Sequence, residues 1–479
     1  MTTDKRLFCQ FEAEENLFER TYNGVPYWQM LRFTVCEGAY SERIERADAI
    51  KKEGRKKQLL LLALKLPFAY INSCIQFGNL KKCDVVCLWD IKKKNQESRF
   101  FDYWIAPPDI KTLRVNEIVN TDMLDVWNQY NFIEPYCKGQ ARYYLKKLFG
   151  KIQIDEHEHV FLQKLEEKIK EKFGRSLSAQ RMELEILHWL EVDKANEAFF
   201  ERFFSKVSCK AMVVVCYYQN QLYAAYRVAK KRGIRIIELQ HGALSAHQEY
   251  WFEDQRGLNN DTPDYCLTFG KAHSTWTKML PTTRAVAVGF PYQEAQINKW
   301  KDLQTEEKTV VIYPQALPEF EEIIDQFVKV MGDKGYRLIL KLHPSQAEEY
   351  NRYYPLLSHN KKLEVITNQE KGIYYWLKLA RHHIVSNTTV GLEAVALSHT
   401  NICVATNIPH AQTQPLLDWG VARGFTNVVE LVDLIENPSH KNMTEERSAL
   451  WKPNAEKNIC EFFVRLKKQN WPEGKLYKE

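Results

Sequence analysis

The chain has 479 residues, of which 45% are hydrophobic and 27% are charged, which is a globular composition. A chain of this length is too long for one ordinary core, so we expect two or three domains. The formal net charge of +6 is small for this size and does not favour a nucleic-acid-binding protein, although it permits a basic patch facing phosphates or an anionic membrane. The 11 cysteines include no Cys-x-x-Cys pair and follow no secretion signal, so we expect a reducing, cytoplasmic compartment.

Residues 1–80 are predicted to form a helical N-terminal region. Within it, the stretch 51–68 consists of a basic run followed by a leucine-rich segment. This segment is shorter than the roughly 20 residues that span a bilayer, and Lys65 and Pro67 interrupt it. A basic run beside an apolar helix suits an anionic membrane surface. The stretch therefore predicts either peripheral membrane contact or a buried helix with a solvated basic flank.

Residues 81–300 predict a first α/β domain. From residue 211 onward, short apolar runs alternate with helical patterns, as is typical of a parallel, doubly wound sheet. The charged stretch 95–210 contains long helical patterns but is not placed further. Strands are expected at 83–88, 212–216, 234–239, 265–269 and 285–289, and helices at 161–173, 180–204 and 221–231.

Residues 301–479 predict a second domain of the same kind, joined to the first by the polar stretch 292–307 and closed by a C-terminal helix. Ligands of open α/β sheets bind at the carboxyl ends of the strands. The predicted fold class is therefore α/β, with two Rossmann-like domains facing across a cleft and with helical N-terminal additions. Strands are expected at 309–313, 336–340, 363–367, 383–385 and 400–405, and the last helix at 445–468.

Two strands of the second domain end in polar residues. Lys341 and His343 follow the run 336–340, and Gln315 follows the run 309–313. Alternation along a strand points Lys341 and His343 to one face. A lysine and a histidine side by side suit a phosphate or pyrophosphate group, and the alternative is a strand-terminal polar pair with no ligand. We expect these three residues to bind a nucleotide donor.

A third strand end has hydroxyl side chains. Ser386, Thr388 and Thr389 follow the run 383–385 and precede a helical pattern. Such residues are ordinary N-caps, but a helix start also offers backbone N–H groups to an anion. Glu393 shares a helix face with Thr389, because the two are four residues apart. The segment predicts either a capped helix with a surface carboxylate, or a donor site in which Glu393 takes ribose hydroxyls.

A candidate catalytic residue lies in the first domain. His241 follows the strand 234–239 and precedes Gly242, which permits a sharp turn. At the lip of the first domain it would face the second-domain pocket, as a general base for an acceptor hydroxyl or as a cation beside a leaving phosphate. The alternative is a loop histidine bonded to backbone. Other candidates for a base are His247, Glu249, Glu253, Asp254, Asp90 and Asp102.

Several common motifs are absent from the sequence. It has no Asp-x-Asp, no carboxylate-histidine cluster at metal spacing, no Gly-x-Gly-x-x-Gly and no P-loop. We therefore expect neither a metal nor another cofactor. Lys, Arg, His and helix dipoles would have to stabilise a leaving phosphate.

At these residues the sequence resembles a known family. The segment 341–344, Lys-Leu-His-Pro, is similar to the "HP" motif of bacterial capsule and lipopolysaccharide glycosyltransferases of the GT-B fold, and the segment 386–394 is similar to their Ser/Thr motif. The order and spacing also resemble capsular Kdo transferases, polysialyltransferases and teichoic-acid glycerophosphotransferases. Gln240-His241-Gly242 resembles the Trp-His-Gly loop of the last group, with Gln in place of Trp. The resemblance covers roughly residues 210–410.

The resemblance implies a GT-B fold, with an acceptor domain at 81–300 and a nucleotide-donor domain at 301–479. It implies that Lys341, His343, Ser386, Thr388 and Thr389 bind the donor nucleotide and that His241 lies near the reacting centre. The acidic motif that supplies the base in polysialyltransferases is absent, which leaves the base unassigned.

The expected function is metal-independent transfer of a sugar from a nucleotide-activated donor, such as a CMP-sugar or another NDP-sugar. The expected acceptor is a glycan or a lipid-linked molecule of bacterial surface polysaccharide synthesis, used at the inner face of the cell membrane. Three alternatives stay open: transfer of a polyol phosphate from a CDP-linked donor, epimerisation of a nucleotide sugar, and a non-catalytic GT-B scaffold.

Overall fold

The structure is a computed structural model of the chain. The predicted membrane-surface stretch 51–68 and the candidates Asp102, His247, Glu249, Glu253 and Asp254 lie outside the residues that it describes, and only the backbone of Asp90 is described. It describes residues 5–40, 70–90, 107, 109–116, 130–131, 134–150, 153–242, 244, 262–276, 283–368, 370–408, 412–438, 444–468 and 475–476.

The first sheet is doubly wound. In spatial order its strands are β16-β9-β8-β7-β6-β3-β4-β5, and all neighbours pair in parallel except β16 with β9. The strand order therefore reverses between β3 and β6, where the chain crosses from one half of the sheet to the other. The strands are β3 (Val85–Asp90), β4 (Thr112–Asn116), β5 (Tyr130–Asn131), β6 (Ala211–Val215), β7 (Arg235–Leu239), β8 (Tyr265–Thr268), β9 (Arg284–Ala287) and β16 (Lys475–Leu476).

The second sheet has six parallel strands in the order β12-β11-β10-β13-β14-β15, so its order reverses between β10 and β13. This is the Rossmann order, counted 3-2-1-4-5-6 along the chain. The predicted fold class, two Rossmann-like α/β domains with helical additions, is confirmed. The strands are β10 (Glu306–Ile312), β11 (Arg337–Lys341), β12 (Leu363–Ile366), β13 (Ala380–Val385), β14 (Asn401–Ala405) and β15 (Arg423–Phe425).

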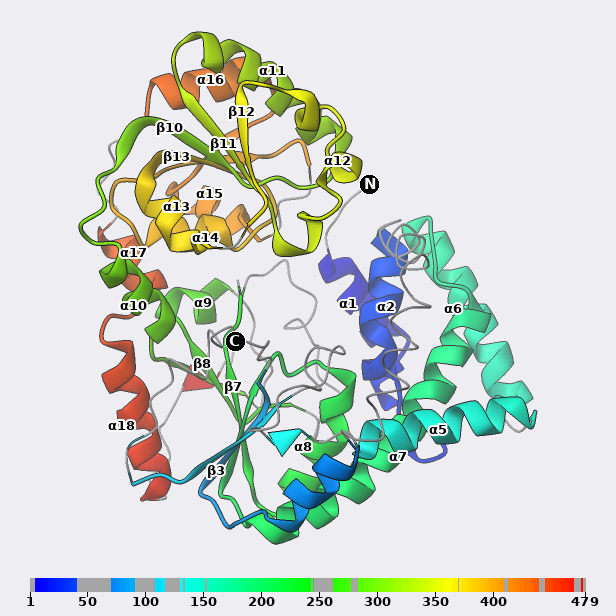
Figure 1. Cartoon of the computed structure of the whole chain (residues 1–479). Coiled ribbons are helices and arrows are strands. Elements are labelled where there is room, and N and C mark those ends of the chain that lie inside the picture. Colours follow the sequence, from blue (N-terminus) through cyan, green and yellow to red (C-terminus); the bar gives the residue numbers. More distant parts are fainter. Residues whose placement is uncertain are drawn as a thin grey trace.

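Helices cover both faces of the second sheet (Figure 1). Val310 and Ile312 of β10 pack in a cluster with residues of α11 and α16, whereas Val311 packs in a second cluster with residues of α13 and α14. Strands covered on both faces need apolar residues at every position, which is why they read as continuous runs. The helices are α11 (Pro318–Asp333), α12 (Tyr350–Tyr353), α13 (Ile373–Leu379), α14 (Val390–Val395), α15 (Gln414–Asp418) and α16 (Val428–Glu436).

The C-terminal segment returns to the first sheet. The predicted helix 445–468 is two helices, α17 (Thr444–Leu450) and α18 (Ala455–Lys467). Pro453 and Asn454, with its left-handed φ of 61°, separate them, since a proline cannot continue a helix from the preceding turn. Ile459, Phe462 and Phe463 of α18 pack with strands β3, β6 and β7 of the first sheet. The domain boundary near residue 300 stays a prediction.

Helices that precede the first sheet, or that connect its first strands, form a large lateral addition (Figure 1). A buried ion pair joins its first two helices: Arg32 Nε donates to Glu12 Oε1 over 2.6 Å, and Trp28 Nε1 donates to the same oxygen over 2.8 Å. The helices are α1 (Lys5–Glu14), α2 (Trp28–Tyr40), α5 (Glu134–Leu148), α6 (Glu156–Phe173) and α7 (Ala179–Val207).

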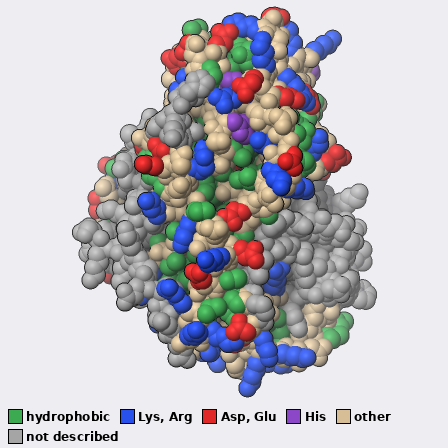
Figure 2. Space-filling view, turned by 90° about the vertical axis from the view of Figure 1, so that its left-hand side faces the viewer, with side chains coloured by type: hydrophobic (Ala, Val, Ile, Leu, Met, Phe, Trp, Pro, Cys, Tyr) green, Lys and Arg blue, Asp and Glu red, His purple; other side chains and the backbone are tan. Residues whose placement is uncertain are grey.

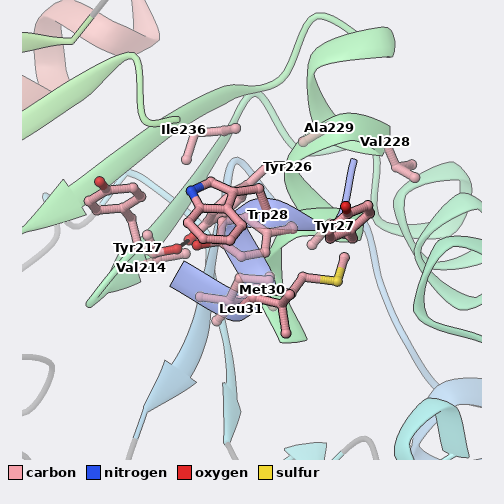
Figure 3. Close-up of a cluster of buried hydrophobic side chains, with 14 of the residues drawn as sticks. Tyr27, Trp28, Met30, Leu31, Val214, Tyr217, Tyr226, Val228, Ala229 and Ile236 are labelled. Carbon is pink, nitrogen blue, oxygen red and sulfur yellow. Dashed lines mark hydrogen bonds between the residues drawn. The ribbon is translucent and has the colours of Figure 1, made fainter. Parts of the chain in front are cut away.

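The helical addition and the first sheet share one core. Figure 3 shows the Trp28 indole among side chains of β6, α8 (Tyr223–Lys231) and β7, which are more than 180 residues away in the sequence. In addition, Asn220 Nδ2 donates to the Met30 carbonyl over 2.9 Å. The segment after β6 is therefore held against the N-terminal helices. The labelled cluster comprises Tyr27, Trp28, Met30, Leu31, Val214, Tyr217, Tyr226, Val228, Ala229 and Ile236.

An aromatic cluster joins the two domains. Phe269, after β8, stacks on Phe290 at 4.5 Å and on Trp451 at 5.1 Å between ring centroids. These residues share a core with Val311 and Val385 of the second sheet. Two short helices flank the cluster: α9 (Lys271–Trp276) and α10 (Pro291–Lys299), the second of which takes up much of the polar stretch 292–307.

Charges are mixed on the face shown in Figure 2, where Lys and Arg side chains alternate with Asp and Glu. The positive excess is therefore not gathered into one patch on that face. Among the described helices, none is both long enough and apolar enough to cross a membrane.

Candidate functional site

The candidate site of the second domain lies at the carboxyl ends of β10 and β13, between which the strand order reverses. Gln315 follows the end of β10, and its Nε2 donates to the Asn387 carbonyl over 2.7 Å, just after β13. This bond ties together the two strand ends that border the crossover, which is where ligands of doubly wound sheets bind. The carbonyl oxygen of the Gln315 side chain stays free of this bond.

The segment after β13 is held in place from its other side. Thr413 Oγ1 donates to the Ser386 carbonyl over 2.7 Å, and the Gln412 backbone N–H donates to Asn387 Oδ1 over 2.8 Å. Ser386 is fully buried, and its Oγ has no hydrogen-bond partner among the described residues. A buried hydroxyl without a partner is costly, so a ligand that bonds this oxygen would remove the cost.

The two threonines contribute little to capping. Thr389 occupies the N-cap position of α14, but its side chain makes no capping hydrogen bond. Thr388 Oγ1 accepts from the Val390 N–H over only a long 3.4 Å. Both are half-buried. Capping alone therefore does not account for Thr389, and the prediction that these hydroxyls contact a donor stays open.

Glu393 lies one turn into α14 and is 8% exposed. The pKa of Tyr313, the residue after β10, is raised by burial and, to a lesser degree, by the charge of Glu393. The Tyr313 hydroxyl lies 3.4 Å from His383 Nδ1. The predicted surface carboxylate is thus a buried one, on the same edge of the sheet as Ser386 and Gln315, because Tyr313 directly follows β10.

Lys341 and His343 lie in different surroundings. Lys341 is buried, and its Nζ donates to the carbonyls of Leu342 over 3.0 Å and Asn368 over 3.4 Å. Burial lowers the pKa of Lys341 to about 8. His343 lies beyond β11 and is exposed. Two of the three ammonium donors of Lys341 therefore bind backbone, whereas the imidazole of His343 faces outward.

In the first domain, Gln240 shapes the loop that carries the candidate base. Its buried side chain donates through Nε2 to the Gly242 carbonyl over 2.7 Å and accepts through Oε1 from the Phe269 N–H over 2.7 Å. Gln240 thereby connects the ends of β7 and β8. Gln240, which stands where the Trp-His-Gly loop has Trp, therefore has a structural role here.

His241 has one bonded nitrogen and one unbonded one. Its Nε2 lies 3.1 Å from the Tyr218 hydroxyl, and its buried Nδ1 has no hydrogen-bond partner among the described residues. Burial lowers the pKa of His241 to about 4, so the imidazole is neutral at pH 7. A neutral imidazole is the form that accepts a proton, and this environment disfavours the cationic role.

The His241 loop and the Ser/Thr segment meet across the domains. A Cβ placed on Gly242 would lie 3.5 Å from Thr389 Cγ2, which is van der Waals contact. The structure thus brings the Gln240–Gly242 loop next to Thr389, with Ser386, Gln315 and Glu393 on the same edge of the second sheet.

The turn after β6, which brings Tyr218 to His241, was missed from the sequence. Cys216 has a left-handed φ of 64°, which is unusual for a residue other than glycine. The turn leads the Tyr217 N–H to Glu238 Oε1 over 3.1 Å and Tyr218 to His241. Glu238 is fully buried, and burial raises its pKa to about 8. The strand-end rule, applied to the predicted strand 212–216, would have found Tyr218.

No family model matches the chain, and no curated protein matches it. Among the side chains that the structure describes, no three His, Cys, Asp or Glu residues are grouped so as to hold a metal ion.

Solved structures with similar architecture include two UDP-GlcNAc 2-epimerases. The one from Neisseria meningitidis, bound to UDP-GlcNAc, is 11% identical, with a TM-score of 0.48 over 81% of this chain and 100% of that one. The one from Methanocaldococcus jannaschii is 12% identical, with a TM-score of 0.45 over 80% and 99%. The calicheamicin glycosyltransferase CalG4 is 9% identical, with a TM-score of 0.44 over 82% and 100%. Likeness at this level carries no conclusion about activity.

The buried histidines predict an acid-sensitive fold. Because burial lowers their pKa values below the ordinary 6.5, the unfolded chain binds more protons than the folded chain below that pH. We therefore expect the melting temperature to fall as the pH drops from 6.5 towards 4, with each histidine adding up to about 1.4 kcal/mol per pH unit. The pKa is lowered to about 4 for His241, His382 and His399, and to about 3 for His273 and His383.

Glu238 should act with the opposite sign. Its raised pKa of about 8 means that the folded chain keeps a proton that the unfolded chain loses above pH 4.5, so its contribution to stability falls as the pH rises from 4.5 to 8. Calorimetry of wild type and Glu238→Gln across this range tests both effects. The variant should gain on wild type as the pH rises and should lose stability in acid like wild type. A melting temperature independent of pH below 6.5 would contradict the histidine prediction.

Proposed function

We propose that this protein is a metal-independent transferase that uses a nucleotide-activated sugar. The observation that carries the proposal is that the His241–Gly242 loop lies next to Thr389, because this brings the carboxyl edges of two doubly wound sheets together at one point. One edge offers a neutral base and the other offers hydroxyl, amide and carboxylate groups. A two-substrate reaction needs both kinds of surface in contact.

In this proposal the second-sheet edge holds the donor. Glu393 takes ribose hydroxyls, and Ser386, Thr388 and Thr389 donate to phosphate oxygens. Gln315 offers its side-chain oxygen to the base or the sugar. His343 and Lys341 approach the phosphates from the end of β11. Neutral donors fixed before the reaction stabilise charge that develops on the leaving phosphate.

His241 serves as the general base. Its neutral imidazole removes the proton from an acceptor hydroxyl, the hydroxyl oxygen bonds to the anomeric carbon, and the bond from that carbon to the nucleotide phosphate breaks. Tyr218 fixes one imidazole nitrogen by the 3.1 Å contact, which leaves the other for the proton. The motif resemblance supports a glycan or lipid-linked acceptor of bacterial surface polysaccharide synthesis, at the inner face of the membrane.

The first test is a thermal-shift screen with CMP, CDP, UDP, GDP and their sugar conjugates. A ligand at 100 times its dissociation constant adds roughly 2.7 kcal/mol to stability. Products are then analysed with the stabilising donor. A new glycosidic bond supports the proposal, a phosphodiester favours polyol-phosphate transfer, and an epimer of the donor without acceptor favours epimerisation. Binding without any product favours the scaffold, and no binding at all contradicts the proposal.

The buried carboxylate gives a sharper prediction about the donor. We expect Glu393→Gln to weaken binding of the nucleotide selected in the screen by about tenfold, because a charged acceptor for ribose hydroxyls is lost at a buried position. The measurement is isothermal titration with the ribonucleotide and with its 2′-deoxy and 3′-deoxy analogues. In wild type, at least one deoxy analogue should bind about tenfold more weakly.

The variant and the analogues form a cycle. If Glu393 contacts the ribose, the deoxy penalty should nearly disappear in Glu393→Gln. The matched control is Glu319→Gln, an exposed carboxylate in the first turn of α11 in the same domain. An undiminished deoxy penalty in Glu393→Gln would remove Glu393 from the ribose site.

A further inference from the structure

Helix α5 turns an apolar face to solvent. Its opposite side packs tightly: a Cβ on Gly139 would lie 2.6 Å from the Val192 Cα of α7, and Tyr143 is buried. On the other side of the helix, near its C-terminal end, lie large apolar residues that are exposed to solvent. The exposed fractions are 62% for Tyr144, 54% for Leu145, 78% for Leu148 and 66% for Phe149.

This arrangement reverses the usual amphipathic pattern, in which the apolar stripe faces the core. At 100° per residue, Leu145 and Leu148 lie on the side of α5 opposite to Gly139 and Tyr143. Figure 1 shows α5 at the edge of the molecule, on the side of the helical addition and away from the second sheet. A contiguous exposed apolar stripe of this kind marks a surface that binds a membrane or another protein.

Basic side chains border the stripe. Arg142 and Lys146 lie on one side of it and Lys147 on the other, and all three are exposed. Lys146 also pairs with Glu191. No acidic residue occurs between 135 and 154, where the sequence has five basic ones: Lys138, Arg142, Lys146, Lys147 and Lys151.

We propose that this α5 face, formed by Arg142, Tyr144, Leu145, Lys147 and Leu148 together with Phe149 directly after the helix, docks on an anionic membrane surface. The leucines and phenylalanine would enter the boundary between headgroups and acyl chains, while the basic side chains meet anionic headgroups. Tyrosine suits the same depth because it has an apolar ring and a polar tip. The excess of basic residues in the segment 135–154 complements anionic lipid. The proposal is independent of the nucleotide site and of the stretch 51–68.

The test is co-sedimentation of the full chain with vesicles. Wild type should bind phosphatidylcholine vesicles that contain phosphatidylserine, should bind less at high salt, and should not bind pure phosphatidylcholine. The double variant Leu145→Glu with Leu148→Glu should bind at least about tenfold more weakly. Arg142→Gln with Lys147→Gln should lose about fivefold per charge.

Matched controls change exposed residues of the same kind elsewhere. Val429→Glu alters a 75% exposed valine on α16, and Lys457→Gln removes a positive charge on α18, so both should bind vesicles like wild type. Because the substituted α5 positions are exposed, we expect these variants to keep the wild-type melting temperature, which would show that the fold is intact.

Three results would overturn the proposal. The first is failure of wild type to bind the phosphatidylserine vesicles, and the second is equal binding by the α5 variants. The third is lipid-free self-association that Leu145→Glu with Leu148→Glu abolishes, because a second copy of the chain would then cover the face. If binding is lost only when Lys51, Lys52, Lys56 and Lys57 are changed to Gln, the membrane contact belongs to 51–68 and α5 is excluded.

Discussion

His241→Ala is expected to lower kcat by about 10²–10⁴-fold while nucleotide affinity stays within about twofold of wild type. The imidazole lies on the first-domain loop next to Thr389, where Tyr218 holds it. Because it lies in the other domain from Ser386 and Glu393, its removal should leave the donor edge intact. The measurements are single-turnover transfer rates and titration of the nucleotide.

Controls separate a catalytic role from a structural one. His359→Ala removes an exposed histidine of the second domain and should leave kcat unchanged. Tyr218→Phe keeps the ring but loses the contact with His241 Nε2, and it should lower kcat less than His241→Ala does. Since the pKa of His241 is about 4, the wild-type rate should hold from pH 7 down to about pH 5 unless another group limits it. Normal turnover by His241→Ala would leave His241 as a loop residue.

Gly270→Ala should lower stability by at least about 3 kcal/mol, the largest structural effect that we expect. A Cβ on Gly270 would lie 2.2 Å from the Ala449 carbonyl oxygen and 2.4 Å from that of Leu450. Both are backbone atoms of the segment that returns from the second domain to the first. They cannot swing aside, so the chain must separate from α9 or strain the aromatic cluster of Phe269 and Trp451.

The matched control is Gly78→Ala, where an added Cβ meets no atom within 4 Å. It lies in a helical stretch, so the substitution should be neutral or slightly stabilising. Thermal unfolding followed by near-ultraviolet circular dichroism reports both variants. Limited proteolysis should cut Gly270→Ala early near 444–455 if the returning segment detaches. Equal melting temperatures of Gly270→Ala and wild type would show that this contact is not needed for the joined domains.

The strands of the second sheet were readable from the sequence for a physical reason. The central parts of β10, β11 and β14 are covered on both faces, so residues 310–312, 338–340 and 402–405 form continuous apolar runs. By contrast, β4 and β15 were missed, because β4 alternates Leu and Val with polar residues and β15 has only three residues. A short or half-covered strand leaves no such run.

The same rule located part of the candidate site. Strand ends pointed to His241, Ser386 and Thr389, which lie where the two sheets meet. It did not reveal that Lys341 directs two of its donors to carbonyls, nor that Tyr218 contacts His241. Those facts depend on which neighbours a side chain meets.

By itself, the sequence determined the two successive parallel sheets and the places where their strands end. A strand that is buried on both faces needs consecutive apolar residues, and such a run is visible in the sequence. Only the tertiary structure decided which strand ends meet and which polar groups stay unpaired. The contact of Gly242 with Thr389, the bond from Gln240 to Phe269 and the return of α18 to the first sheet all join segments far apart in the chain. Such contacts follow from the packing of whole domains, and no local pattern of residues specifies them.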